Sequence, residues 1–221
     1  MEKMVAFCGI VCTECPAFIA TQKETSMTNF IFRMMTTVMK IRGIFRNKKR
    51  EVLLTGIKEG DIVLDYGCGI GFNTIPAAWI VGEKGKVYAL DIHPLAIKTV
   101  EMKIRKKGLV NIETILSGLD TGLPDESVDI ILLYNVLPII ENQTDLIKEL
   151  YRVLRSGGVL SVKSGLGVNL YSREKIKTND LEKLMIDKGP LKLKKKIGKF
   201  YIFEKNNEED KLLKETKKNG L

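Results

Sequence analysis

Residues 63–72, which read VLDYGCGIGF, combine an acidic side chain with glycines at alternate positions. Asp65 lies near the end of an apolar run, and Gly67, Gly69 and Gly71 follow it. Glycine permits a sharp turn from a strand into a helix, and its missing side chain lets a ligand lie against the main chain. A carboxylate at this place repels a pyrophosphate and attracts a cation. The pattern therefore predicts a loop that binds a ligand with an ammonium or similar positive group.

Two further aspartates follow the next two predicted strands. Asp91 ends the run KVYALD, at about the position where dinucleotide-binding folds place an acid on ribose hydroxyls. Asp120, in SGLDTGLP, can accept a hydrogen bond from an exocyclic amine such as that of adenine. Because the carboxyl ends of parallel strands meet at one edge of a sheet, both are expected to share a crevice with Asp65. Together these acids describe a site for an adenosine with a positively charged tail.

Each motif also has a purely structural interpretation. The glycines alone fit a tight turn, Asp91 alone fits a helix cap before Pro94, and Asp120 alone fits a turn. A nicotinamide dinucleotide is the natural competing ligand for such a loop. Asp65 and the scarcity of catalytic side chains around the loop argue against it. The conjunction of the motifs favours the adenosine.

The elements that must position these residues alternate along the chain between strands and helices. Strands are predicted over 62–67, 86–92, 112–118, 128–136, 159–164, 191–199 and 200–205, and helices over 72–82, 94–108, 142–158 and 172–189. Alternation with short connections is typical of a parallel sheet that is covered by helices. The last two strands are close enough in sequence to form an antiparallel hairpin. The sequence thus predicts an α/β fold with a doubly wound, Rossmann-like sheet of seven strands, helices on both faces and an antiparallel final strand.

Composition and charge narrow the class of protein. The chain has 221 residues, of which 44% are hydrophobic and 29% charged, as is typical of a globular protein. No apolar run approaches the roughly 18 residues of a membrane span, and no secretory signal is evident, so a cytoplasmic location is expected. The net charge of +9 comes largely from local clusters that a solvated surface explains at least as well as nucleic-acid binding does.

Four segments in order resemble the motifs of class I S-adenosylmethionine-dependent methyltransferases. They are VLDYGCGIG, ALDIHP, SGLDTGLPDESVDIILLYNVL and ELYRVLRSGGVL. The resemblance covers about residues 48–205 and implies S-adenosylmethionine as the cofactor and methyl transfer as the activity. A small molecule is the expected acceptor, because YNVLPII stands where enzymes that methylate amino groups of bases carry an N/D-P-P-Y/F motif.

The resemblance also implies roles for individual residues. Asp65 and the glycine loop correspond to positions that meet the methionine end of the cofactor, and Asp91 corresponds to the ribose ligand. Many relatives carry an acid directly after the glycine that matches Gly118, whereas here Leu119 intervenes. The end of the fourth strand faces the methyl sulfonium and is expected to position the reactants. The residues assigned to the cofactor are Asp65, Tyr66, Gly67, Cys68, Gly69, Gly71, Asp91, Ile92, Leu119, Asp120, Tyr134 and Asn135.

The resemblance divides the chain into four parts. These are a cysteine-bearing leader (1–22), an N-terminal lid helix (23–47), the methyltransferase domain (48–205) and a charged tail (206–221). Apolar residues from Met27 to Ile41 recur at helical spacing, and the methionines among them suit either an apolar acceptor or ordinary core packing. His93, the single histidine, is expected at the surface or at the rim of the cofactor site. No residue is assigned as a general base.

Three cysteines in the leader form a separate motif. Cys8, Cys12 and Cys15 have C-x3-C-x2-C spacing, and thiolates at this distance can ligate one soft ion. Zinc usually takes four ligands, so buried or redox-active thiols are the other interpretation. The alternative functions are therefore a thiol-rich protein that binds a metal or metalloid on a methyltransferase fold, or an arsenite-type methyltransferase. The absence of cysteines after Cys68 argues against the arsenite enzyme.

Overall fold

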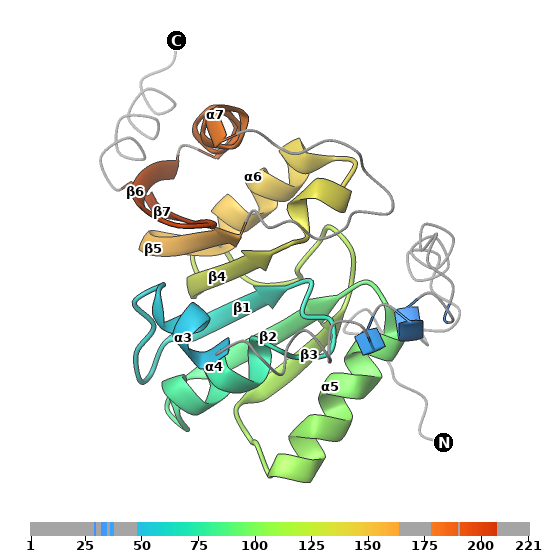
Figure 1. Cartoon of the computed structure of the whole chain (residues 1–221). Coiled ribbons are helices and arrows are strands. Elements are labelled where there is room, and N and C mark those ends of the chain that lie inside the picture. Colours follow the sequence, from blue (N-terminus) through green and yellow to red (C-terminus); the bar gives the residue numbers. More distant parts are fainter. Residues whose placement is uncertain are drawn as a thin grey trace.

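The computed structural model describes residues 29, 32–34, 36–37, 48–163, 178–189 and 191–206. Within this part of the chain, a central twisted sheet is flanked by helices (Figure 1). The strands are β1 (Ile62–Tyr66), β2 (Lys86–Asp91), β3 (Ile112–Leu116), β4 (Val128–Tyr134), β5 (Leu154–Lys163), β6 (Leu191–Ile197) and β7 (Phe200–Lys205). The helices are α3 (Lys48–Leu53), α4 (Thr74–Val81), α5 (Pro94–Lys107), the short 3-10 helix η1 (Leu137–Ile139), α6 (Gln143–Val153) and α7 (Thr178–Lys188).

The strand order confirms the predicted topology. The described strands form one seven-stranded sheet in the order β3-β2-β1-β4-β5-β7-β6. Neighbours from β3 to β5 are parallel, whereas β7 runs antiparallel to both β5 and β6. The chain reverses direction along the sheet after β3, so the carboxyl ends of β1 and β4 flank the point at which doubly wound folds bind ligands.

Alternate residues of the central strands pack on opposite faces of the sheet. In β4, Ile131 and Leu133 join a cluster that includes residues of α6 and α7, whereas Ile130 and Leu132 join one that includes residues of α3 and α4. Every residue of β4 is buried, as expected for a strand that is covered on both sides. This central position makes the carboxyl end of β4 a rigid support for a site.

The structure differs from the sequence prediction where α6 meets β5. We predicted a helix that continues to the paired glycines, but α6 ends at Val153 and β5 begins at Leu154. Leu154 pairs with Val128 of β4, and Arg155 forms an ion pair with Asp129. The pairing supplies partners for backbone groups that a frayed helix end would leave to water, so tertiary contacts overrode the helical pattern.

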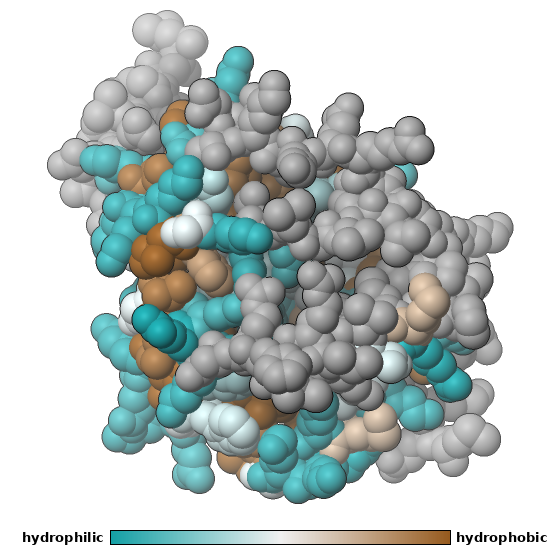
Figure 2. Space-filling model, viewed as in Figure 1, coloured by the Kyte–Doolittle hydropathy of each residue, from teal (hydrophilic) through white to brown (hydrophobic). Residues whose placement is uncertain are grey.

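The described surface shows no dominant apolar face on the side that is drawn in Figure 2, where hydrophobic side chains form small, separate patches among hydrophilic ones. None of the helices in the described part of the chain combines the length and the apolar character that crossing a membrane requires.

Candidate functional site

The loop between β1 and α4 is fixed against the end of β2. The backbone N–H groups of Gly67 and Cys68 both donate to the carbonyl of Leu90, at 2.8 and 2.9 Å. From α5, the ammonium group of Lys103 donates to the carbonyl of Ile70. These bonds hold the loop as a preformed turn at the carboxyl edge of the sheet.

Glycine suits two positions of this loop for different physical reasons. Gly67 has φ +72°, and a Cβ built there would lie 2.2 Å from Cγ2 of Val136, so close packing against the segment after β4 excludes a side chain. Gly69 has φ +54°, and no heavy atom lies within 4 Å of its added Cβ. Gly67 thus satisfies packing, whereas Gly69 leaves open space beside the main chain.

Asp65 lies beneath this loop, almost entirely buried, with 1% of its surface exposed. Its Oδ2 accepts a hydrogen bond of 2.6 Å from the hydroxyl of Thr74, in the first turn of α4. The pKa of Asp65 is raised to about 6, chiefly by burial and also by the charge of Asp91, while hydrogen bonds from Thr74 oppose the rise. Near neutral pH the carboxylate of Asp65 is therefore mostly ionised, and burying its charge destabilises the folded protein.

Asp91, at the end of β2, contacts the glycine loop directly. Its Oδ2 accepts from the N–H of Gly69 and its Oδ1 from the N–H of His93, both at 2.8 Å. Burial raises the pKa of Asp91, although these two backbone hydrogen bonds oppose the rise. The structure thus brings Asp65, Asp91 and the glycine turn together, and half-buried Ile92 follows directly in the chain.

His93 was expected at the surface or at the rim of the cofactor site; it is buried rather than at the surface, lies beside Asp91 and caps α5. Its Nδ1 accepts from the N–H of Leu95, and 5% of the residue is exposed. Its ring stacks on Phe32, with centroids 4.1 Å apart and an interplanar angle of 14°. Phe32 also packs with Ile70 of the glycine loop. The histidine is therefore a packing and capping residue that joins a helical residue of the N-terminal segment to the loop.

The segment after β3 is placed beside the end of β1. The hydroxyl of Tyr66 donates to the carbonyl of Gly118 at 2.6 Å. Leu119 is 41% exposed, and exposed Asp120 accepts from the N–H of Gly122 at 2.8 Å. Asp120 therefore serves as a turn residue, and its contact with a ligand stays a prediction.

Cys68 fills a small space within the loop. It is buried, and its thiol lies 3.8 Å from the carbonyl oxygen of Gly69. Burial raises the pKa of the thiol well above its ordinary value, and the charges of Asp65 and Asp91 raise it further. The thiol is therefore protonated and inert at neutral pH.

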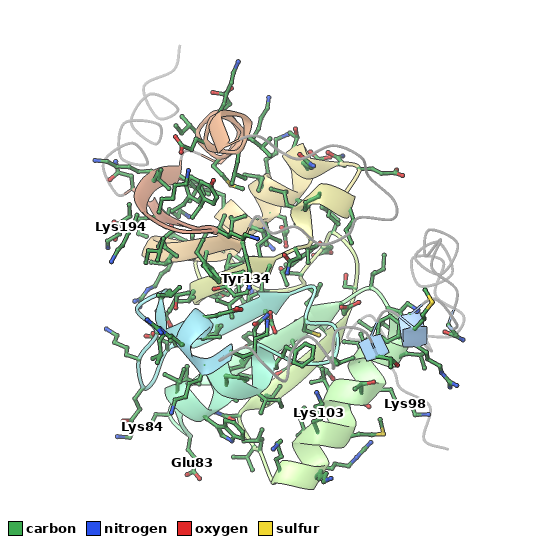
Figure 3. The ribbon with its side chains drawn as sticks, viewed as in Figure 1. Glu83, Lys84, Lys98, Lys103, Tyr134 and Lys194 are labelled. Carbon is green, nitrogen blue, oxygen red and sulfur yellow. The ribbon has the colours of Figure 1, made fainter. Side chains whose placement is uncertain are left out.

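Tyr134 and Asn135 occupy the carboxyl end of β4. Tyr134 lies in the centre of the molecule (Figure 3), and its hydroxyl is 3.0 Å from the hydroxyl of Ser161. Asn135 is exposed and has φ 62°, a left-handed conformation that few non-glycine residues adopt and that often occurs at functional sites. Its N–H donates to the carbonyl of Lys163 at 3.2 Å, so β5 holds this conformation.

A buried ion pair supports the same end of the sheet. The ammonium group of Lys163 lies 2.6 Å from a carboxylate oxygen of Glu51 in α3, with only 2% of the lysine side chain exposed. It also lies 4.7 Å from the ring centroid of Phe200. Burial alone raises the pKa of Glu51, but the hydrogen bond from Lys163 and the charge of Lys48 outweigh it and hold the pKa below its ordinary value.

Comparison with known proteins assigns the chain to a family. Residues 57–217 match the family described as "Methyltransferase domain", which is well over half of the chain. The chain belongs to the class I S-adenosylmethionine-dependent methyltransferases. The sequence prediction of the family and of the fold is thereby confirmed.

Individual relatives agree with this assignment. The chain is 30% identical over 126 residues to "Demethylmenaquinone methyltransferase" from Geobacillus stearothermophilus, covering 57% of this chain and 54% of the relative. It is 32% identical over 134 residues to "Ubiquinone/menaquinone biosynthesis C-methyltransferase UbiE" from Hydrogenovibrio crunogenus, covering 59% and 52%. A crystal structure of a SAM-dependent methyltransferase from Aquifex aeolicus superimposes with a TM-score of 0.62 at 27% identity, covering 72% of this chain and 88% of that one. The match thus spans about half the length of the curated relatives.

The residues around the glycine loop fit the cofactor that the family uses. The open space at Gly69 accommodates a ligand against the main chain, and Asp91 presents carboxylate oxygens beside it. One buried acceptor, Oδ1 of Asn73, lacks a hydrogen-bond partner in the described part of the chain. Acidic and acceptor groups around an open turn complement hydroxyls and a positive charge, which an adenosyl sulfonium carries.

Sequence reasoning missed several residues of this site. Asn73 and Thr74 lie just after the glycine loop. A polar pair at the start of a predicted helix was the signal that could have identified them. Glu51 and Lys163 are 112 positions apart, and no sequence pattern links them. Phe32 was predicted only as part of a helix.

The predicted metal site is a different case. Cys8, Cys12 and Cys15 lie outside the described residues. Within the described ranges, no three or more histidine, cysteine or acidic side chains are grouped so as to hold a metal ion.

Proposed function

We propose that this protein transfers a methyl group from S-adenosylmethionine to a small-molecule acceptor. The observation that carries the proposal is the pair of carboxylates, buried Asp65 and half-buried Asp91, around a preformed glycine turn at the carboxyl edge of the sheet. Family membership supports the same conclusion. A glycine turn alone would serve many nucleotides, whereas this pair of acids favours a cationic one.

Each described group has a proposed task in this function. Asp91 accepts from the ribose hydroxyls, while Gly67 and Gly69 keep the loop close to the ligand. Tyr66 fixes the segment after β3, and Leu119 and Asp120 border the adenine, with Ile92 and Cys68 completing the wall. This assignment follows the family positions and is supported by the contacts of the glycine loop with Asp91.

The chemistry asks little acid–base work of the protein. S-adenosylmethionine supplies an electrophilic methyl group when it is bound, so the protein mainly aligns a nucleophile and excludes water. Asn135 and Tyr134 stand where that alignment is needed. The left-handed backbone of Asn135 turns its exposed side chain out of the strand, and the Lys163 carbonyl holds it. We propose positioning, rather than proton transfer, as the role of both residues.

An apolar acceptor of the quinone class is the first candidate. The segment after Asn135 is apolar, and Ile139 in η1 is 52% exposed beside the carboxyl end of β4. The named substrates of the curated relatives are of this class. Residues 23–47 are proposed to cover the site as a lid, which the stacking of Phe32 on His93 supports.

Calorimetry with S-adenosylhomocysteine tests the cofactor assignment. We expect heat of binding for the wild-type protein, and an affinity that falls at least tenfold in Asp91→Ala, because a lost hydrogen bond to a charged group is worth roughly 1.5–3 kcal/mol. Asp125→Ala is the control, since that aspartate side chain is 76% exposed and belongs to a surface ion pair. Absence of heat from the wild-type protein would refute the proposal.

A transfer assay with labelled methyl groups tests the acceptor. Quinone-like rings, thiols, arsenite, polar amines and RNA form separate arms. Label transferred to a quinone-like ring supports the first candidate. Label found only on arsenite, with loss of activity in a Cys8→Ser, Cys12→Ser, Cys15→Ser variant, would favour the arsenite-type alternative, and metal bound to those cysteines without transfer would favour the metal-binding one.

A further inference from the structure

Three residues form a row across the carboxyl end of the sheet. Lys163, the last residue of β5, pairs in register with Tyr134 of β4 on one side and with Phe200 of β7 on the other. Both aromatic residues belong to the hydrophobic cluster on the α3 side of the sheet. The ammonium group of Lys163 lies 4.7 Å from the ring centroid of Phe200 and 5.8 Å from that of Tyr134. The charge of the lysine therefore lies against both rings.

A carboxylate of α3 balances this charge. Oε2 of Glu51 accepts a hydrogen bond of 2.6 Å from the ammonium group of Lys163 and one of 3.2 Å from that of Lys48. Only 2% of the Lys163 side chain and 13% of the Glu51 side chain are exposed. Apolar residues of similar volume often replace a buried ion pair with no loss of stability. Stability alone therefore does not account for an ion pair between aromatic rings, and a functional role is indicated.

The main chain of the same lysine holds Asn135. The N–H of Asn135 donates to the carbonyl of Lys163 at 3.2 Å, and Asn135 has the left-handed φ of 62°. This conformation costs free energy in a residue other than glycine and persists only where the surroundings fix it. Lys163 is the last residue of β5, so the bond of its side chain to Glu51 anchors the carbonyl at the point where the strand ends.

We infer that the ion pair of Lys163 and Glu51 positions Asn135 for the methyl acceptor. The inference rests on the proposed function, in which Asn135 aligns the acceptor, and it adds two positioning residues on β5 and α3. Both side chains are nearly covered and neutralise each other, so they act on the acceptor through Asn135. The glycine turn is held by Leu90 and Asp91 instead, so the affinity for the cofactor should not depend on the ion pair.

Two buried lysines are compared to test the inference. In Lys163→Met, kcat for methyl transfer to 1,4-naphthoquinol, an electron-rich ring of the proposed acceptor class, should fall roughly tenfold or more, because a small misplacement of the reactants slows the transfer steeply. The Kd for S-adenosylhomocysteine should change less than about twofold. Lys205→Met is the matched control. Lys205 has 3% of its side chain exposed and pairs with Glu126 at 3.3 Å, but it binds the carbonyl of Leu154 at the opposite edge of the sheet, so kcat should stay within about twofold of wild type.

Two further measurements separate positioning from stability. The double variant Lys163→Met, Glu51→Gln removes both charges, so a merely structural role predicts that kcat recovers together with stability. We expect kcat to stay within about twofold of Lys163→Met, because residues that act as a unit lose their shared function only once. Hydrogen exchange of the Asn135 N–H, followed by NMR, reports on the support without any acceptor. It should become roughly tenfold faster in Lys163→Met and stay unchanged in Lys205→Met.

The outcomes are distinguishable. If the wild-type protein does not bind S-adenosylhomocysteine, the proposed function fails and the inference fails with it. If it binds, but exchange at Asn135 is no faster in Lys163→Met than in Lys205→Met, the proposed function stands and the inference is refuted. A loss of kcat that the double variant recovers refutes it as well. If naphthoquinol accepts no methyl group from the wild-type protein, the exchange rate of Asn135 decides alone.

Discussion

Replacing Asp65 by asparagine should stabilise the protein without ligand and weaken binding of the cofactor. Burial raises the pKa of Asp65 from 3.8 to about 6. A difference of about 2 pKa units, at 1.36 kcal/mol each, corresponds to roughly 3 kcal/mol that the folded protein loses when the carboxylate ionises. Asparagine keeps an oxygen for the hydroxyl of Thr74 but carries no charge, so it avoids this cost.

The pH dependence identifies the cause. A group with a raised pKa contributes stability that is fully present below its unfolded pKa and is lost as the pH rises through its folded pKa. The stability advantage of Asp65→Asn over wild type should therefore be smallest near about pH 4 and grow by about 3 kcal/mol by about pH 8. Urea unfolding followed by circular dichroism across this range, on both proteins, measures the difference directly.

A second variant should shift the pH range over which this stability is lost. The Thr74 hydrogen bond lowers the pKa of Asp65, so Thr74→Val should shift the pH-dependent loss of stability upwards. A stability difference between wild type and Asp65→Asn that stays constant with pH would refute the buried charge. In the presence of S-adenosylhomocysteine the stability advantage of Asp65→Asn should shrink, because the charge that destabilises the free protein also attracts the positive end of the ligand.

Three further perturbations follow from the site and its support. Gly67→Ala should cost at least about 2 kcal/mol in urea unfolding, because the new methyl group overlaps Val136 and φ is positive there, and Val136→Ala should partly rescue it. Lys163→Met should cost roughly 1.5–3 kcal/mol at neutral pH, because Glu51 loses a hydrogen bond to a charged group while Lys48 still pairs with it, and unchanged thermal unfolding would contradict this role of Lys163. A hydrogen bond from Arg152 lowers the pKa of Glu149 to about 2. The stability that this carboxylate contributes is therefore present above its unfolded pKa and disappears as the pH falls towards 2. Glu149→Gln should flatten the acid limb of a stability–pH curve.

The sequence alone predicted the fold and the glycine turn after β1, because both depend on local patterns. Buried parallel strands appear as apolar runs of limited length, and glycines at alternate positions mark a turn whatever surrounds them. The end of α6 was wrong for the opposite reason, since the residues from Leu154 favour a helix locally but pair with Val128 of β4 in the folded chain. Of the two positions expected for His93, the surface and the rim of the cofactor site, the surface was wrong because Phe32, far away in sequence, covers its ring.

What the tertiary structure decided is which polar groups are paired and which are not. The sequence placed Asp65 at the methionine end of a cofactor, but only the folded chain shows that Thr74 occupies it and that it is buried. Lys163 of β5 pairs with Glu51 of α3, although the two residues are 112 positions apart in the sequence, and no local pattern encodes this pairing. Hydrogen bonding and burial depend on distances between residues remote in sequence, so the role of an acid in this site is set by the packing around it rather than by its motif.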